Sequence, residues 1–310
     1  QDYLEKLKEV VDKDSFKYKS EQFELNHCKI VNRSLYLKHN ENEIITMTGK
    51  AVRESYCHLT CDVDESSFIN KWMNKNENIK CYEDMNMYPE PLICPSNTYN
   101  LWLPFEIAQK TGTYEKNENG LNFILKHIKI ICDNEESVSD YVTKWMAQML
   151  QFPATKTTAL AFVGKQGAGK SSVVRICEAL IGKNKVLETT DPFRDCWGDF
   201  NGQMLNAFLV SIPELKKKDF LQGHGKINGI VTDPTITINS KGTNQITIKS
   251  FHRMIYTSNN DDPVATSKDD RRNVIIRTSD ELLNNKIYFD TLYEYLKDIN
   301  TLRTLYDYLM

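Results

Sequence analysis

The most restrictive feature of the sequence is the stretch from Gly164 to Ser171, which reads GKQGAGKS. It matches the phosphate-loop pattern G-x-x-x-x-G-K-[ST] at every fixed position, after an apolar run at 160–163 and before a helical pattern at 173–177. Glycine accepts positive φ angles and lets backbone N–H groups approach phosphate oxygens, and the following helix directs its positive end at the same anion. This context predicts a nucleoside triphosphate site, with Lys170 on the β- and γ-phosphates, and disfavours an ordinary glycine-rich turn.

Length and composition set the class of protein. The chain has 310 residues, 40% of them hydrophobic, which suffices for one large domain or two ordinary ones. No apolar run approaches the length of a membrane span, and the first residues are charged, so we expect a soluble intracellular protein. Because the chain starts without Met and ends in a helical pattern, we expect a fragment of a longer polypeptide.

The net charge of −3 is too small for a general nucleic-acid-binding surface, so any DNA or RNA contact must be local. Eight cysteines in a chain of this size fit reduced thiols better than a disulfide scaffold. A zinc site is the weaker alternative, since only one tight pair of ligands occurs. Its candidate ligands are Cys57, Cys61, Cys81 and Cys94.

The first 100 residues give little information about function. Residues up to about 60 show no strong period, residues 63–80 contain one short helical pattern, and the proline-rich stretch 88–97 reads as an extended connector. We therefore expect an N-terminal region that ends near residue 100.

Two helices are predicted next, over 121–131 and 138–149, the second capped by Ser137 or Ser139 and stopped by Pro153. Together they make residues 101–153 a helical collar. Its apolar face favours packing against the core, with contact to neighbouring subunits as the alternative.

Residues 154–280 read as a nucleotide-binding core, followed by a helical segment at 281–310. A helix is expected from Lys170 to Ile181, closed by Gly182. Buried strands are expected at 157–163, 185–188, 205–212, 254–257 and 273–277.

Polar residues follow these strands where catalytic groups are expected. Glu214 follows the strand at 205–212 and is the candidate for holding Mg²⁺ and polarising water, with a surface carboxylate as the alternative. Asn259 follows the strand at 254–257 and is either a γ-phosphate contact or a turn residue. Arg271 and Arg272 precede the last strand, where each is either a stabiliser of phosphoryl charge or a surface ion-pair partner.

A β-hairpin is predicted from two alternating, β-branched stretches, 235–239 and 245–249, which flank a tip at 240–244. Lys241 lies at that tip. A cationic finger of this kind can hold phosphates without reading bases, whereas the alternative is a structural hairpin with a solvated lysine.

Taken in order, the phosphate loop, Glu214, the lysine-tipped hairpin, Asn259 and Arg272 resemble the superfamily 3 helicases, a branch of the AAA+ ATPases. The stretch from Trp145 to Asn273 is most similar to the poxvirus-type primase-helicase group of large DNA viruses, phages and plasmids. The resemblance implies an α/β AAA+ P-loop fold with a mainly parallel sheet flanked by helices, after the collar and a smaller N-terminal α+β region.

The resemblance also implies site residues and partners. ATP would bind Gly164, Gln166, Gly167, Ala168, Gly169, Lys170, Ser171 and Ser172. Ser171 and Glu214 would hold Mg²⁺, Asn259 would sense the γ-phosphate, and Arg272 would reach the ATP of the next subunit. Lys226 and Lys241 would contact single-stranded DNA.

Further implied partners are forked DNA, copies of this chain in a ring that is usually a hexamer, and a primase domain or polymerase. Two departures stand out: Pro213 precedes Glu214, so Glu214 would serve both metal and water, and no primase site is visible. An ATP-dependent assembly or DNA-binding module without unwinding activity is the alternative function.

Overall fold

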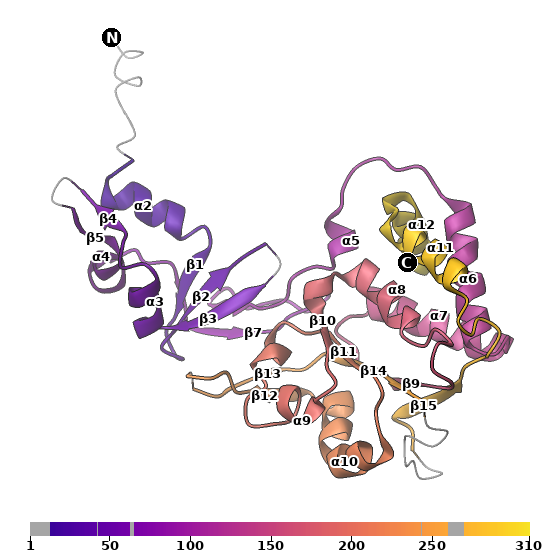
Figure 1. Cartoon of the computed structure of the whole chain (residues 1–310). Coiled ribbons are helices and arrows are strands. Elements are labelled where there is room, and N and C mark those ends of the chain that lie inside the picture. The colour runs from indigo at the N-terminus through magenta and orange to yellow at the C-terminus, as the bar shows by residue number, and fades with distance from the viewer. Residues whose placement is uncertain (1–12, 42, 63–64, 243, 260–269) are drawn as a thin grey trace. The chain divides into compact units, whose positions relative to one another are not determined.

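The computed structural model describes residues 13–41, 43–62, 65–242, 244–259 and 270–310. These residues form two compact units (Figure 1). The first contains the described residues of 1–86, 94–101 and 242–246, and the second those of 87–93, 102–241 and 247–310. Within the described part of the chain, no helix is long and apolar enough to cross a membrane.

The first unit is built on a four-stranded sheet in the order β3-β2-β1-β6, antiparallel except for the parallel β1 and β6 pair. Its strands are β1 (His27–Ile30), β2 (Leu35–His39), β3 (Ile44–Thr48) and β6 (Cys81–Tyr82). Two smaller pairs are β4 (Thr60–Cys61) with β5 (Ser66–Ser67) and β7 (Asp84–Asn86) with β8 (Thr98–Asn100).

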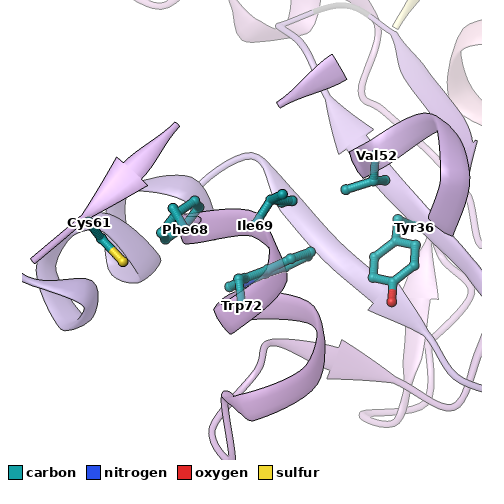
Figure 2. Packing of buried hydrophobic residues seen from close by; sticks show 6 residues of the cluster. All are labelled: Tyr36, Val52, Cys61, Phe68, Ile69 and Trp72. Carbon is teal, nitrogen blue, oxygen red and sulfur yellow. The ribbon is translucent and has the colours of Figure 1, made fainter. Parts of the chain in front are cut away.

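Three helices complete the first unit: α2 (Phe16–Phe23), α3 (Gly49–Ser55) and α4 (Phe68–Lys75). The helical pattern within 63–80 is therefore confirmed as α4, which buries Phe68, Ile69 and Trp72 on one face. Figure 2 shows these three side chains with Tyr36, Val52 and Cys61 in a common buried cluster. The Trp72 indole N–H donates to Glu24 Oε1 at 2.7 Å, so its polar atom is satisfied inside this core.

The second unit contains a five-stranded sheet with the order β10-β11-β14-β9-β15, in which all neighbouring strands are parallel. The strands are β9 (Ala159–Val163), β10 (Val186–Glu188), β11 (Leu209–Ile212), β14 (Arg253–Ser258) and β15 (Asn273–Arg277). Every residue of β9, β11 and β14 is buried, as expected for parallel strands covered on both faces. Helices flank this sheet in Figure 1, which confirms a mixed α/β fold with a parallel sheet.

The helices of this unit are α5 (Glu106–Gln109), α6 (Glu118–Ile131), α7 (Glu136–Gln151), α8 (Ser172–Ile181), α9 (Pro192–Asp195), α10 (Lys217–Thr232), α11 (Lys286–Lys297) and α12 (Ile299–Leu309). The N-cap of α7 is Glu135, which makes no side-chain capping bond, so the predicted cap at Ser137 or Ser139 is wrong. Both serines lie inside the first turns of the helix instead, and Ser139 donates to the Glu136 carbonyl at 3.0 Å.

The predicted hairpin is confirmed as β12 (Thr235–Ile238) and β13 (Ile246–Lys249), which pair in a two-stranded sheet. Asn201 ties β12 to the preceding loop, because its Nδ2 donates to the Thr237 carbonyl at 3.0 Å. Lys241 is exposed at the tip, where Gly242 has a φ of 82°. Thr243, also in the predicted tip, lies outside the described residues.

Candidate functional site

A cavity of about 830 Å³ lies over the phosphate loop, at the edge where the parallel strands of the second unit end. Its walls come from the loop, from the residues after β10, β11 and β14, and from α11. They are lined by Gln166, Gly167, Gly169, Lys170, Ser171, Ser172, Thr190, Pro213, Glu214, Thr257, Asn259, Asn284, Lys286, Phe289, Asp290 and Tyr293.

Lys170 is a buried side chain of this cavity, with 7% of its surface exposed. Its Nζ donates to the carbonyls of Gly164 and Lys165, each at 2.7 Å, and to Asn259 Oδ1 at 2.8 Å. Burial lowers the pKa of the Lys170 ammonium, and the Glu214 carboxylate works in the opposite direction. The ammonium is thus held at the bottom of the cavity with oxygen atoms on three sides.

Two glycines of the loop have backbone angles that disfavour other residues. Gly167 has a φ of 83° and Gly169 a φ of 91°. A Cβ atom at Gly167 would lie 2.5 Å from Asn284 Oδ1, and one at Gly169 would lie 2.5 Å from the Phe289 ring. Only glycine therefore permits both the turn of the loop and the close approach of residues 284–289.

Glu214 follows β11 after Pro213 and has a φ of 55°, in the left-handed region that non-glycine residues rarely adopt. Its backbone N–H faces Thr257 Oγ1 on β14 at 3.4 Å, and the next N–H, of Leu215, donates to the Thr257 carbonyl at 2.9 Å. Strained backbone of this kind concentrates at functional sites. The turn holds an exposed carboxylate in the cavity wall.

Asn259 comes from a different strand, since it follows β14. Because β14 lies between β9 and β11, its carboxyl end is flanked by the phosphate loop on one side and by Glu214 on the other. The hydrogen bond from Lys170 to Asn259 closes this arrangement. The sequence-predicted Lys170, Glu214 and Asn259 are thus brought into one cavity.

The remaining loop residues divide between the cavity and the interior. Ser171 is exposed in the cavity wall at the N-cap of α8, whereas Ala168 is fully buried. Gly164 lines a neighbouring cavity instead. Ser172 is 1% exposed, and its Oγ donates to the Gly169 carbonyl at 2.6 Å. The Ser172 hydroxyl is therefore directed into the protein.

Helix α11 also lines the cavity, which the sequence pattern did not predict. Lys286, Phe289, Asp290 and Tyr293 share one face of this helix, because they are spaced by three, one and three residues. Asn284 precedes the helix with a φ of 56°, and its N–H donates to the Gly167 carbonyl at 3.2 Å. More than 100 residues separate this segment from the loop, so no local pattern could have connected them.

Arg272 lies at the amino-terminal ends of the strands, whereas the phosphate loop lies at their carboxyl ends. It precedes β15, whose residues Asn273 and Arg277 pair with Ala159 and Val163 at the two ends of β9. Five residues of strand, about 16 Å at 3.3 Å per residue, therefore separate Arg272 from the start of the loop. Arg272 lines a separate cavity of about 340 Å³ with Arg271 and Lys156.

The two predicted DNA-binding lysines occupy different elements. Lys241 is at the hairpin tip, but Lys226 belongs to α10, and its ammonium donates to the Trp197 carbonyl. Lys226 reaches this acceptor because α10 packs on Trp197 through Gly223, where a Cβ would lie 2.9 Å from the indole.

The candidate zinc ligands do not converge. Within residues 13–41, 43–62, 65–242, 244–259 and 270–310, no group of three His, Cys, Asp or Glu side chains could hold a metal ion. Cys61 is buried, whereas Cys57 and Cys81 are exposed. A hydroxyl and a carboxylate in the main cavity, from Ser171 and Glu214, are hard oxygen donors of the type that Mg²⁺ takes.

Known proteins resemble this chain in sequence and in fold. Residues 162–272 match a family model described as "Family of unknown function (DUF5906)". The chain is 26% identical over 186 residues to the "DNA Primase-polymerase" of Nitratiruptor phage NrS-1, an alignment that covers 59% of this chain and 25% of the phage protein. This chain thus spans about a quarter of the length of that relative.

Solved structures of the NrS-1 C-terminal region share the fold. The apo structure of residues 305–718 gives a TM-score of 0.68 at 17% identity and covers 90% of this chain and 65% of that one. A second form, the A form apo structure, gives 0.67 at 18% identity with the same coverage. At these identities the likeness concerns the fold alone.

Proposed function

We propose that this chain is an ATP-driven DNA helicase module of the superfamily 3 and AAA+ type, which translocates on single-stranded DNA and unwinds duplex during replication. The observation that carries the proposal is the convergence of Lys170, Glu214 and Asn259 in one cavity at the ends of β9, β11 and β14. The name of the phage relative, a DNA primase-polymerase, supports a role in DNA replication.

The residues divide the chemistry of ATP hydrolysis among them. Backbone N–H groups of the loop and the Lys170 ammonium bind the phosphate oxygens. Ser171 and Glu214 would hold Mg²⁺, which would supply charge neutralisation on the β- and γ-phosphates. Glu214 orients the attacking water. Asn259 contacts the γ-phosphate, so the presence of that phosphate affects the end of β14. The hairpin proposed to bind DNA is joined to this strand, since β13 comes just before β14 in the chain.

Hydrolysis of ATP with Mg²⁺ tests this assignment. Lys170→Ala removes a charge aimed at the transferring phosphoryl group, so we expect a loss of about 100-fold or more in kcat/KM. Glu214→Gln keeps the size of the side chain but removes the base and a metal ligand, so ATP should still bind while hydrolysis falls by a similar factor.

Lys144→Ala is the matched control, because Lys144 is an exposed lysine on α7 that pairs with Asp140 and does not line the cavity. It should hydrolyse ATP like the wild type. Wild-type hydrolysis by Lys170→Ala, in a folded protein, would contradict the proposal.

A further inference from the structure

A buried histidine of the collar is connected to the phosphate loop by two short hydrogen bonds. His127 lies on α6 with no exposed surface, and its Nε2 is 2.5 Å from Ser172 Oγ. The same Oγ lies 2.6 Å from the Gly169 carbonyl oxygen. These three residues form a relay from α6 to the loop, and neither the phosphate-loop pattern nor the proposed chemistry requires the histidine.

The donor and acceptor of each hydrogen bond in the relay follow from the hydrogen atoms that the three groups carry. The Gly169 carbonyl can only accept, so the single Ser172 hydroxyl hydrogen points to it. Ser172 Oγ must then accept from His127, which places the imidazole hydrogen on Nε2. The other ring nitrogen, Nδ1, has no partner among the described residues, and a bare acceptor there costs less than a bare N–H donor.

Holding the Gly169 carbonyl in place also holds the backbone N–H of Lys170, which donates a hydrogen bond to phosphate. The carbonyl of Gly169 and the N–H of Lys170 belong to the same trans peptide, so they point in opposite directions. The carbonyl accepts from both the N–H and the hydroxyl of Ser172, on the interior side. The Lys170 N–H is consequently turned away from the interior, toward the cavity.

Rings on α11 enclose the histidine. The ring centroid of His127 is 5.6 Å from that of Tyr288 and 5.9 Å from that of Phe289. An apolar residue would fill such surroundings without the cost of burying an N–H group, which indicates that the hydrogen bond rather than the volume accounts for a histidine here.

We propose that His127 is a positioning residue of the nucleotide site, which acts through Ser172 to hold the Gly169 peptide in the phosphate-binding orientation. The inference rests on the proposed ATP site for its functional consequence. The orientation of the peptide itself is testable without nucleotide.

Four variants distinguish the effect of the hydrogen bonds of the relay from the effect of side-chain packing. His127→Leu removes the donor and keeps an apolar side chain, whereas His127→Gln keeps an N–H donor at a similar reach. Ser172→Ala removes only the central hydroxyl, so it remains informative if His127→Leu does not fold. Phe123→Leu is the matched control for packing, because Phe123 lies one turn earlier on α6, stacks on Tyr288 at 4.8 Å and has no side-chain hydrogen-bonding atom.

Amide hydrogen exchange of residues 164–172 in the nucleotide-free protein is the first measurement. We expect His127→Leu and Ser172→Ala to speed exchange of this segment about tenfold, the effect of one lost buried hydrogen bond, and the double variant to add little. His127→Gln and Phe123→Leu should resemble the wild type. Unchanged exchange in His127→Leu and Ser172→Ala overturns the proposal, as does an equal effect of Phe123→Leu or a failure of His127→Gln to rescue.

The Kd for ATP is the second measurement. The two variants that break the relay should bind ATP about tenfold more weakly, with thermal midpoints that do not explain the loss. Wild-type affinity in both variants overturns the functional part of the inference. Failure of the wild type to bind ATP would instead overturn the proposed function, and the exchange experiment would still decide whether the relay holds the loop.

Discussion

At the scale of single residues, the cavity depends on groups that are costly to place. Lys170 is an ammonium with 7% exposure whose pKa is lowered by burial, and Glu214 occupies a left-handed backbone conformation. Each such feature costs of the order of 1 kcal/mol or more, and folding elsewhere must offset it. Their occurrence together in one wall is difficult to explain by stability alone, which favours a catalytic role.

Buried histidines give the second unit a distinctive dependence on pH. Burial lowers the pKa of His127 and of His252 to about 4. His252 Nδ1 lies 2.9 Å from Ser250 Oγ, and its Nε2 faces the Met204 carbonyl at 3.0 Å. Between the unfolded pKa of about 6.5 and the folded value, the unfolded chain binds more protons, so stability is full above this window and falls as pH falls through it.

We therefore predict a loss of about 2 kcal/mol per histidine in the free energy of unfolding between pH 7 and pH 5. Urea unfolding at a series of pH values measures it. The carboxylates with lowered pKa values, such as Asp195 beside Arg194, lose their contribution only below their usual pKa of 3.8 and so act at lower pH. A flat free energy from pH 7 to pH 5 would contradict the assignment.

The sequence predicted the loop, Glu214 and Asn259 because each follows a strand that is recognisable from its apolar residues. It could not predict the relay through His127, because a lone histidine in a helical pattern gives no sign of its partner 45 positions away. The cavity wall from α11 was missed for the same reason: contacts across long separations leave no period in the sequence.

At the scale of elements, the position of β14 organises the site. Arg253, its first residue, is 1% exposed and lies 5.2 Å over the Phe208 ring. Its guanidinium donates to the carbonyls of Phe251 at 3.0 Å, of Phe152 at 3.3 Å and of Thr155. The arginine thereby satisfies carbonyls just beyond the end of α7 and anchors β14 to the collar.

Arg253→Met removes a buried cationic donor that the Phe251, Phe152 and Thr155 carbonyls share, although Phe152 and Thr155 keep bonds from the Thr155 N–H and from Gln148 Nε2. We predict a loss of about 2–4 kcal/mol in the free energy of unfolding. Arg175→Met is the control, because Arg175 pairs with Glu178 and Glu188 at a site where 38% of its side chain is exposed. That change should cost about 1 kcal/mol or less in urea unfolding. Equal losses for the two variants would show that Arg253 is not an anchor.

Elements with weak local signals were the ones that sequence reasoning did not find. Helix α10 contains Gly223, Gly225 and Gly229, which lower helix propensity, and it forms because tertiary packing against Trp197 outweighs propensity. The four-stranded sheet of the first unit was not predicted, for a different reason. Its strands are short and their buried and exposed residues do not alternate, as in β2, where the first three residues are all buried.

At the scale of the whole molecule, the two ends of the parallel strands carry different candidate residues. Lys170, Glu214 and Asn259 lie where the strands end, and Arg272 lies where β15 begins. Arg272 is thus remote from the cavity of its own chain. If it stabilises phosphoryl charge, a neighbouring copy must supply it, which is the geometry of a ring with shared sites.

Mixing two inactive variants tests this sharing. Lys170→Ala and Arg272→Ala should each hydrolyse little ATP, but in random mixed rings about a quarter of the interfaces join an intact Lys170 to an intact Arg272. An equal mixture should therefore regain up to about a quarter of wild-type hydrolysis. Mixing Lys170→Ala with the double variant should restore nothing. Co-assembly without recovery, seen by particle mass and hydrolysis together, would argue against a shared site.

ATP-dependent displacement of one strand from forked DNA tests the central claim most directly. The wild type should displace the strand only with ATP and Mg²⁺, Lys170→Ala should displace none, and Lys241→Ala should hydrolyse ATP while displacing little. If the wild type hydrolyses ATP and assembles on the fork yet displaces no strand, the chain is an assembly module and the helicase account is wrong.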